Sequence, residues 1–477
     1  MKDFAISDNP AVQAQLDRLG ALTLPQGRFG LEAITALLTR LGDPQRNIPP
    51  TFHVAGTNGK GSTCAYLRAM LEAQGLTVHT ATKPHLVRYN ERIRIAGKLI
   101  EDDLLAALLG EVLDAGADLK PSFFEVTAAA AFLAFARHPA DACVIEVGLG
   151  GRFDATNVLE RPAACGIATL GIDHEAFLLR PEEGVPQEPL ERIAFEKASI
   201  AKAGSPLVTQ AYPAEVARAV AQTAASHRAE LFMRGHAWGA SFDEHRLSDS
   251  IEYYDCYGPL VLPLPLLAGA HQADNAALAV AMLRHQDRVS VSPEAMAEGI
   301  RKARWPARLQ LLGEGPLTAL AGGRKVWLDG GHNADAGEAI AKFFGAGAAP
   351  VLRQAQRERE LFANQTPNPA QHEFVEGRAK GLHLIIGMLE NKDPGAIVAP
   401  LRDKLLSVSV VPAPGHDAHR PEDFAPHTDL PVRGFANVEQ ALAALPPANE
   451  TGEGDVLIAG SLYLAGEVLR LNRELPD

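Results

Sequence analysis

The stretch TFHVAGTNGKGST, residues 51–63, joins a predicted strand to a predicted helix. Thr51–Val54 has the short apolar pattern of a buried strand, and Ser62–Gln74 is predicted as the helix that follows. The glycines between them let backbone N–H groups turn toward an anion, and the start of a helix adds the positive end of its dipole. Lys60 can reach the β- and γ-phosphates of a nucleotide, and Ser62 offers a hydroxyl group to a phosphate or to Mg²⁺. The stretch therefore predicts a phosphate-binding loop.

This loop departs from the strict GxxxxGK[ST] pattern at two positions. Val54 stands where the first glycine is expected, and Gly61 separates Lys60 from Ser62. The other interpretation is a glycine-rich turn with an incidental lysine. The order of strand, lysine, hydroxyl groups and helix favours the phosphate loop.

Further short apolar runs, each ended by Gly, Asp, Asn or Ser, alternate with helical stretches along the chain, which predicts an α/β protein with parallel sheets. Strands that are apolar throughout suit a sheet covered on both faces. Residues 304–308, Arg-Trp-Pro-Ala-Arg, separate two series of such strands, so we expect two domains, residues 1–304 and 305–477. The polar stretch Arg353–Arg378 is expected to be a surface helix or a mobile insertion. The predicted strands are Ala142–Val147, Gly166–Leu170, Val326–Leu328, Leu382–Ile386 and Asp455–Ile458, and the predicted helices are Thr127–Arg137, Ala273–Arg284, Pro293–Ala303 and Ala334–Phe344.

Composition narrows the class of protein. Hydrophobic residues make up 47% of the 477 residues, which excludes global disorder. The 58 acidic residues outnumber the 45 Lys and Arg, so no nucleic-acid partner is expected. Four cysteines without CxxC spacing exclude a zinc ribbon and a disulfide framework. Because the chain has no apolar run of transmembrane length and no signal-peptide pattern at Met1–Phe4, we expect a cytoplasmic protein with no membrane partner.

The phosphate loop GTNGKGS, residues 56–62, resembles that of the Mur ligase superfamily, and especially that of folylpolyglutamate synthase/dihydrofolate synthase. The segments FFEVT, EVGLGGRFDATN and GSLYLAG look specific for the folate enzymes rather than for cell-wall muramyl ligases. Similar segments follow in family order along nearly the whole chain, and this collinear series is very specific. They are Lys83–Ile93, Phe123–Thr127, Glu146–Asn157, Ile172–His174, Ile193–Ala198, Gly269–Asn275, Trp305–Gln310, Leu328–Asn333, Gly387–Asp393 and Gly460–Tyr463.

The resemblance implies a fold and a reaction. The fold is a P-loop-type parallel-sheet ATPase domain followed by a smaller Rossmann-like α/β C-terminal domain. The reaction uses ATP and Mg²⁺ to convert a substrate carboxylate into an acyl phosphate, which the amine of L-glutamate then attacks. The implied acceptors are dihydropteroate and reduced folates, and the protein is expected to be a monomer. A monofunctional folylpolyglutamate synthase and a catalytically silent nucleotide-binding homologue are the alternatives.

The resemblance also implies the site residues. ATP is expected to contact Gly56, Thr57, Asn58, Gly59, Lys60, Gly61, Ser62, Asn275, Arg308 and Asp329. The pterin-bearing substrate is expected to contact Ser122, Phe123, Phe124, Glu125, Phe153, Asp154 and Ala155, and L-glutamate is expected near Ser461. Lys60, Lys197, Arg308 and His332 are expected to act in catalysis, and Glu146 and His174 to bind Mg²⁺.

Several of these residues allow a structural interpretation as well. Glu146 ends an apolar strand, where a carboxylate would project at the mouth of a parallel sheet, but it could instead cap a helix. His174 could be a structural hydrogen-bonding residue, because Mg²⁺ normally prefers oxygen ligands. Lys197 resembles a lysine that is N-carboxylated in the superfamily, although Glu196-Lys197 could also lie on a solvated helix face. Arg308 could form an interdomain salt bridge, and His332 could cap the next helix.

Lys83 is a departure from the family pattern. The family usually has a serine there, which is a Mg²⁺ ligand, whereas a protonated lysine offers no lone pair and repels a cation. Thr82 or a water molecule could take over the coordination, or Lys83 could contact a phosphate and partly replace the ion. The third possibility is an enzyme with altered metal use or impaired activity.

Overall fold

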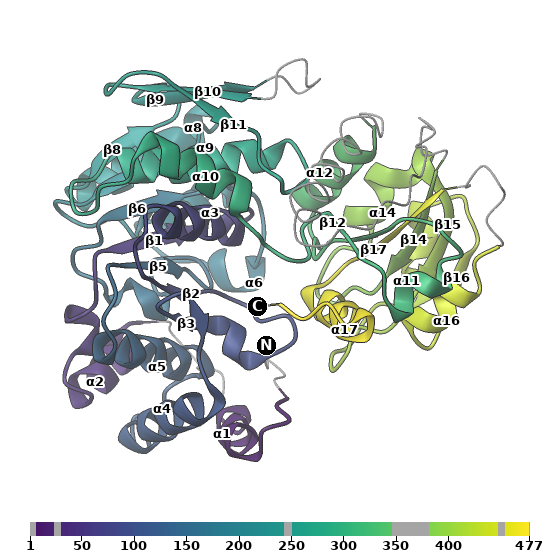
Figure 1. Cartoon of the computed structure of the whole chain (residues 1–477), viewed down its shortest axis with the longest axis horizontal. Coiled ribbons are helices and arrows are strands. Elements are labelled where there is room, and N and C mark those ends of the chain that lie inside the picture. The colour runs from purple at the N-terminus through teal and green to yellow at the C-terminus, as the bar shows by residue number, and fades with distance from the viewer. Residues whose placement is uncertain (1–5, 23–29, 243–249, 346–380, 447–453, 477) are drawn as a thin grey trace, which may run out of the picture.

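The strand that leads into the phosphate loop, β1 (Thr51–Ala55), lies inside an eight-stranded sheet of the computed structural model (Figure 1). The structure describes residues 6–22, 30–242, 250–345, 381–446 and 454–476. The strand order is β4-β3-β2-β5-β1-β6-β7-β8, and all neighbours are parallel except the β2–β3 and β3–β4 pairs. The other strands are β2 (Val78–Ala81), β3 (Ile93–Ile95), β4 (Lys98–Leu99), β5 (Ala142–Glu146), β6 (Ala164–Ile167), β7 (Pro206–Thr209) and β8 (Glu230–Met233).

Helices cover both faces of this sheet, which explains why its central strands are apolar throughout. Side chains alternate across β5, so that Val144 packs into the core on one face, and Cys143 and Ile145 pack into the core on the other. One face carries α3 (Lys60–Ala73), α9 (His271–Arg284) and α10 (Pro293–Lys302). The other carries α1 (Pro10–Gly20), α2 (Glu32–Arg40), α4 (Asp102–Ala115) and α5 (Phe123–Arg137), with α7 (Pro189–Ala198) and α8 (Ala214–Ser226) beside β6 and β7.

A three-stranded antiparallel sheet covers the outer side of α9 and α10 (Figure 1). Its strands are β9 (Trp238–Phe242), β10 (Ser250–Asp255) and β11 (Leu260–Pro263), in the order β11-β10-β9. Trp238, Ile251 and Tyr253 are buried in the same core as α3 and α9. Sequence analysis did not predict this sheet.

The C-terminal domain is built on a six-stranded sheet with the order β12-β13-β17-β14-β15-β16, in which only the β12–β13 pair is antiparallel. Its strands are β12 (Gln310–Leu311), β13 (Val326–Leu328), β14 (Leu382–Ile386), β15 (Leu405–Val410), β16 (Val432–Gly434) and β17 (Asp455–Ala459). Two cores, one on each face, contain Leu328 and Trp327 respectively. The helices are α11 (Pro316–Leu320), α16 (Val438–Ala443) and α17 (Leu462–Asn472) on one face, and α12 (Ala334–Gly345), α14 (Gly395–Leu401) and α15 (Pro421–Phe424) on the other.

The structure confirms an α/β protein with parallel sheets in two domains, and Val326–Leu328 and Leu382–Ile386 are strands with the predicted bounds. The strand predicted at Gly166–Leu170 lies earlier, at Ala164–Ile167, because Thr169 leaves the sheet to bridge to Asn58 of the phosphate loop. The domain boundary at residue 304 stays a prediction. The stretch Arg353–Arg378 lies outside the described residues. Within the described parts of the chain, no helix is long and apolar enough to cross a membrane.

Candidate active site

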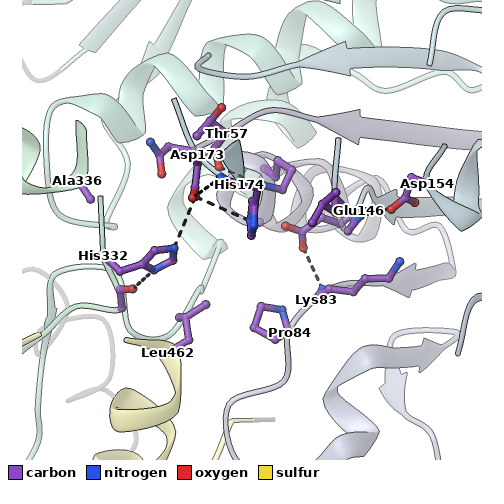
Figure 2. A pocket seen from close by; sticks show the side chains of 18 of the residues that line it. Thr57, Lys83, Pro84, Glu146, Asp154, Asp173, His174, His332, Ala336 and Leu462 are labelled. Carbon is purple, nitrogen blue, oxygen red and sulfur yellow. Dashed lines mark hydrogen bonds and ion pairs between the residues drawn. The ribbon is translucent and has the colours of Figure 1, made fainter. Parts of the chain in front are cut away.

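A cavity of about 750 Å³ lies where the carboxyl ends of β1 and β5 face the C-terminal domain (Figure 2). The carboxyl edge of a parallel sheet is where ligands of open α/β proteins bind. Both domains contribute to its walls. From the predicted site, the residues that line it are Thr57, Asn58, Gly59, Lys60, Gly61, Ser62, Ser122, Phe124, Glu125, Glu146, Phe153, Asp154, Ala155, His174, Asn275, Arg308, Asp329, His332 and Ser461. Gly56, Phe123 and Lys197 do not line it.

The phosphate loop is held in shape by its own backbone. Gly59 has a φ of 83°, and a Cβ added there would lie 2.4 Å from Oδ1 of Asn275, so only glycine fits. Nζ of Lys60 donates to the carbonyl oxygens of Gly56 at 2.9 Å and Thr57 at 3.1 Å. The side chain of Lys60 therefore folds back onto the phosphate loop. Helix α3 begins at Lys60 rather than at the predicted Ser62.

Lys197 lies behind the phosphate loop, not on a solvated helix face. Its Nζ donates to the carbonyl oxygen of Gly56 at 3.0 Å, and the residues Lys197 and Glu196 are each only 4% exposed. Glu196 is compensated inside the protein by Arg152 at 3.1 Å and Arg192 at 3.0 Å. Burial, followed by the nearby charge of Lys60, lowers the pKa of Lys197 to about 7. Near neutral pH, this amine therefore has a large uncharged fraction.

Glu146 ends β5 and faces the cavity from a buried position. Its Oε2 accepts a hydrogen bond from the backbone N–H of Lys83 at 3.1 Å. Burial raises the pKa of Glu146, while Lys60, the Lys83 backbone N–H and Arg308 oppose that rise. The carboxylate is thus surrounded by positive groups before any ligand binds.

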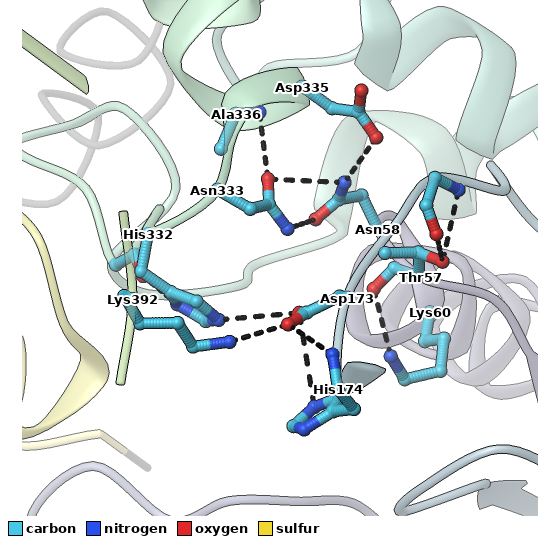
Figure 3. Close-up of polar contacts among 12 residues, drawn as sticks. Thr57, Asn58, Lys60, Asp173, His174, His332, Asn333, Asp335, Ala336 and Lys392 are labelled. Carbon is cyan, nitrogen blue, oxygen red and sulfur yellow. Dashed lines mark hydrogen bonds and ion pairs between the residues drawn. The ribbon is translucent and has the colours of Figure 1, made fainter. Parts of the chain in front are cut away.

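Asp173 joins the two domains and was not predicted as a site residue. Its Oδ1 accepts a hydrogen bond from Nζ of Lys392 at 2.5 Å, and its Oδ2 lies 3.7 Å from Nε2 of His332 and 3.9 Å from Nε2 of His174 (Figure 3). Burial opposes ionisation of Asp173, but His332, His174 and Lys392 hold its pKa far below the ordinary value. Asp173 and Lys392 therefore form an ion pair between the two domains in the wall of the cavity.

A second interdomain contact lies on the phosphate loop itself. Asn333 donates to Oδ1 of Asn58 at 3.1 Å, and Asn58 donates to Oδ2 of Asp335 at 3.2 Å (Figure 3). Asn333 also caps the start of α12, since its Oδ1 accepts from the backbone N–H of Ala336 at 3.0 Å. The C-terminal domain therefore contacts the loop that would hold a nucleotide.

The other C-terminal residues of the predicted site have partners within their own domain. Asp329 accepts hydrogen bonds from the backbone N–H groups of Leu309 at 2.8 Å and Gly331 at 2.7 Å. Arg308 donates to the carbonyl oxygen of Ala307 at 2.8 Å. Ser461 caps α17, and its Oγ accepts from the backbone N–H of Leu464 at 3.1 Å.

The aromatic wall of the cavity lies at the start of α5 and after β5. Phe124 lines the cavity, whereas Phe123 packs edge-on against Tyr89 with a centroid separation of 6.1 Å. Ser122 and Glu125 form a capping box, in which each side chain accepts a hydrogen bond from the other residue's backbone N–H. Both residues line the cavity, and their mutual hydrogen bonds stabilise the start of the helix.

Asp154 lines the same wall, and its carboxylate oxygens accept hydrogen bonds from backbone N–H groups of the protein. Its Oδ2 accepts from the backbone N–H groups of Gly148 and Leu149, both at 3.0 Å, and its Oδ1 accepts from the backbone N–H of Thr156 at 3.0 Å. The carboxylate therefore fixes the loop that follows β5.

Two side chains of the cavity, Glu146 and His174, could be ligands of a divalent metal ion that is also bound to phosphate. Among the described residues, no three His, Cys, Asp or Glu side chains gather into a metal cluster. Glu146 offers a carboxylate oxygen, and burial lowers the pKa of His174 to about 4, which keeps its imidazole neutral and able to donate a lone pair. Mg²⁺ commonly binds through one or two carboxylates together with nucleotide phosphates and water. Glu146 fits such an ion.

No protein-family model matches this sequence, but curated relatives do. The dihydrofolate synthase/folylpolyglutamate synthase of Bacillus subtilis is 38% identical over 328 residues, which cover 66% of this chain and 71% of the relative. The protein of the same name from Escherichia coli is 30% identical over 450 residues, which cover 93% of this chain and 91% of the relative.

Solved structures agree with the curated relatives. Escherichia coli FolC in complex with DHPP and ADP is similar to this chain with a TM-score of 0.76 and 28% identity, over 97% of both chains. The bifunctional folylpolyglutamate synthase/dihydrofolate synthase of Yersinia pestis, complexed with AMPPNP and Mn ion, has a TM-score of 0.75 and 27% identity, over 96% of this chain and 97% of that one.

Proposed function

This chain belongs to the dihydrofolate synthase/folylpolyglutamate synthase family, and from that membership we propose a role for the side chains of its cavity. The protein is an ATP-dependent amide-forming ligase that adds L-glutamate to dihydropteroate, which makes dihydrofolate, and to reduced folates, which makes polyglutamates. Its cofactors are ATP and a divalent metal ion.

The proposed reaction has two steps. A carboxylate oxygen of the acceptor forms a bond to the γ-phosphorus of ATP while the bond between that phosphorus and the oxygen of ADP breaks. The amine of L-glutamate then attacks the carbonyl carbon of the acyl phosphate, and inorganic phosphate leaves as the amide forms. Water must be kept away from the acyl phosphate, which the contact of the two domains over the cavity would favour.

At the nucleotide end, the backbone N–H groups of residues 59–62 would bind the phosphates at the start of α3. Lys60 would exchange its loop carbonyl partners for phosphate oxygens, and Arg308 would stabilise the charge that develops during transfer. A bound magnesium ion would screen the phosphate charge, with Glu146 as its carboxylate ligand and His174 as a nitrogen ligand. Asn275 and Asp329 would contact the nucleotide from the two sides of the cavity.

At the acceptor end, Phe124 and Phe153 offer flat apolar faces to a pterin or benzoate ring. The backbone around Ala155 and the capped start of α5 would set the width of this part of the cavity. His332 and Ser461 lie on the C-terminal wall, and we assign L-glutamate to that side. Lys197 would act from behind the phosphate loop, either as a neutral amine or, after reaction with carbon dioxide, as a carbamate.

The observation that carries these assignments is the single cavity in which the phosphate loop, the aromatic wall and the C-terminal residues meet. The test is ADP release by the purified protein with ATP, Mg²⁺ and L-glutamate, with dihydropteroate and tetrahydrofolate compared as acceptors. We expect glutamate-dependent turnover with both, and none from Lys60→Ala at an unchanged unfolding midpoint. Near-normal turnover of Lys60→Ala would remove the phosphate loop from the mechanism.

Two other outcomes would revise the function. Turnover with tetrahydrofolate alone would leave a folylpolyglutamate synthase and withdraw the roles given to the dihydropteroate contacts. ATP binding without turnover on either acceptor would indicate a silent homologue.

Three broader expectations remain proposals. We place the domain boundary at residue 304, between the end of α10 at Lys302 and the start of β12 at Gln310. We propose a monomer in the cytoplasm, where Cys64, Cys143 and Cys165, all buried and unpaired, would stay reduced. Light scattering of the purified protein would test the oligomeric state.

A further inference from the structure

Lys83 is a lysine of the cavity wall whose ammonium group has no hydrogen-bond partner among the described residues. The neighbouring cations differ in this respect. Lys60 donates to loop carbonyls, Lys392 donates to Asp173, and Arg308 donates to Ala307. A covered ammonium carries three donors, and leaving them without an acceptor is costly. Among the described residues, Lys83 is therefore the cavity cation whose donors remain available to a bound ligand.

The side chain of Lys83 extends from its backbone beside Glu146 toward Asp154 (Figure 2). Its backbone N–H donates to Glu146, while its Nζ lies 3.1 Å from the point that a Cβ on Gly148 would occupy. Oδ2 of Asp154 lies 3.1 Å from the same point. The ammonium is thus next to the loop that carries Phe153 and Asp154, and is turned away from Glu146.

Asp154 compensates the charge of Lys83 without satisfying its donors. The oxygens of Asp154 already accept hydrogen bonds from the backbone N–H groups of Gly148, Leu149 and Thr156. Burial raises the pKa of Asp154, and the charge of Lys83 is the largest of the influences that bring it below its ordinary value. Lys83 therefore has a nearby negative charge and still keeps N–H groups available for a ligand.

The reacting carboxylate of the acceptor must lie between the ring wall and the phosphate loop. A ring against Phe124 and Phe153, together with a γ-phosphate at Lys60, leaves the space beside Glu146 and Gly148 for that carboxylate. Lys83 spans this space. Its Nζ is covered in this structure, and rotation about the last bonds of its flexible side chain would turn the ammonium toward the cavity.

We propose that Lys83 binds the reacting carboxylate of the acceptor and holds it beside the γ-phosphate. This inference rests on the proposed function, because it takes the acceptor to be a carboxylate that attacks ATP. The charge of the ammonium reduces the repulsion between two anions that must approach each other, at the point where the carboxylate oxygen bonds to phosphorus and ADP leaves.

The test compares two ligands on two proteins by equilibrium binding, with ADP present and no turnover. The ligands are dihydropteroate and the same molecule with its carboxylate replaced by a carboxamide. Wild type is expected to prefer the carboxylate by roughly ten-fold or more, the range of a hydrogen bond to a charged group. Lys83→Met is expected to lose most of that preference while its affinity for ADP stays unchanged, and Lys83→Arg, which restores a cation, is expected to recover part of it.

Lys120 provides a matched control, because it is an exposed lysine that lines the same cavity. Lys120→Met should keep the full preference for the carboxylate. A preference that survives in Lys83→Met would overturn the proposal, and so would a loss of ADP affinity with the ligand preference intact, which would assign Lys83 to the phosphates. If Lys83→Met does not fold, Lys83→Gln takes its place in the same comparison. Wild type that binds neither ligand and shows no turnover would instead refute the proposed function.

Discussion

The buried amine of Lys197 predicts an unusual dependence of stability on pH. Replacing it in Lys197→Met keeps the side-chain length but removes the titrating group and its hydrogen bond to Gly56. Below about pH 7, the wild type must hold a charged amine inside the protein behind the phosphate loop, where the charge of Lys60 adds repulsion. Lys197→Met has no charged group at this position, so its folded state is not destabilised by a buried charge.

The direction follows from the lowered pKa of Lys197, which is about 7 instead of 10.5. Below about pH 7 the amine is charged in both the folded and unfolded states, and the cost of burying that charge is fully present. Between about pH 7 and 10.5 only the unfolded state binds the proton, so wild-type stability rises with pH. At about 1.4 kcal/mol per pH unit, the wild type should gain roughly 2 kcal/mol between about pH 7 and about pH 9 that Lys197→Met does not gain.

The assay is urea unfolding of both proteins at about pH 7 and about pH 9, in buffer free of carbon dioxide so that no carbamate forms. Lys120→Met, a change at an exposed lysine, should show the same pH dependence as the wild type. A stability difference between wild type and Lys197→Met that is the same at both pH values would refute the lowered pKa. Adding bicarbonate should then raise turnover of the wild type alone, because only an uncharged amine reacts with carbon dioxide.

Three further changes test other parts of the molecule. Glu146→Ala should reduce turnover by about 100-fold or more at an unchanged unfolding midpoint, and the assigned role fails if ADP release stays near normal. Lys392→Met removes the partner of Asp173, whose side chain is 12% exposed, and should destabilise the protein by roughly 3 kcal/mol in urea unfolding, whereas a surface pair would cost far less. Gly466→Ala would place a Cβ 1.9 Å from the carbonyl oxygen of Leu86, so we expect a loss of about 1 to 3 kcal/mol in unfolding free energy; an unchanged midpoint would mean that α17 can shift.

Apolar runs predicted the central strands well because those strands are buried on both faces. The antiparallel strand β10, Ser250–Asp255, was missed because only alternate residues such as Ile251 and Tyr253 are buried, so it contains no continuous apolar run. Helix α5 begins four residues before the predicted Thr127, since Ser122 and Glu125 form its capping box. The capping box is a local sequence pattern, and the contact of Ser122 and Glu125 with the pterin-bearing substrate stays a prediction.

The site could be predicted only where a motif is local. The phosphate loop directly follows β1 and Glu146 ends β5, so the apolar runs beside them predict their place at the sheet edge. Asp173 and Lys392 are separated by 219 positions in the sequence, so no local sequence pattern predicts their contact. Phe124 faces the cavity, whereas Phe123 packs against Tyr89. Which of the two side chains faces the cavity depends on how α5 packs against Tyr89.

The position of β1 between β5 and β6 has a consequence for synthesis of the chain. Both neighbours of β1 are made later, and β5 begins roughly 90 residues after it, so at about 5 to 20 residues per second the strand waits on the order of 5 to 20 seconds for its first partner. During that time an apolar strand emerges from the ribosome with both edges open. β2 waits for the same partner on one side and can pair only with β3 on the other. Translation of β5 is therefore the step that joins β1 to β2, and chaperones that bind extended apolar segments should contact the nascent protein chiefly before residue 142.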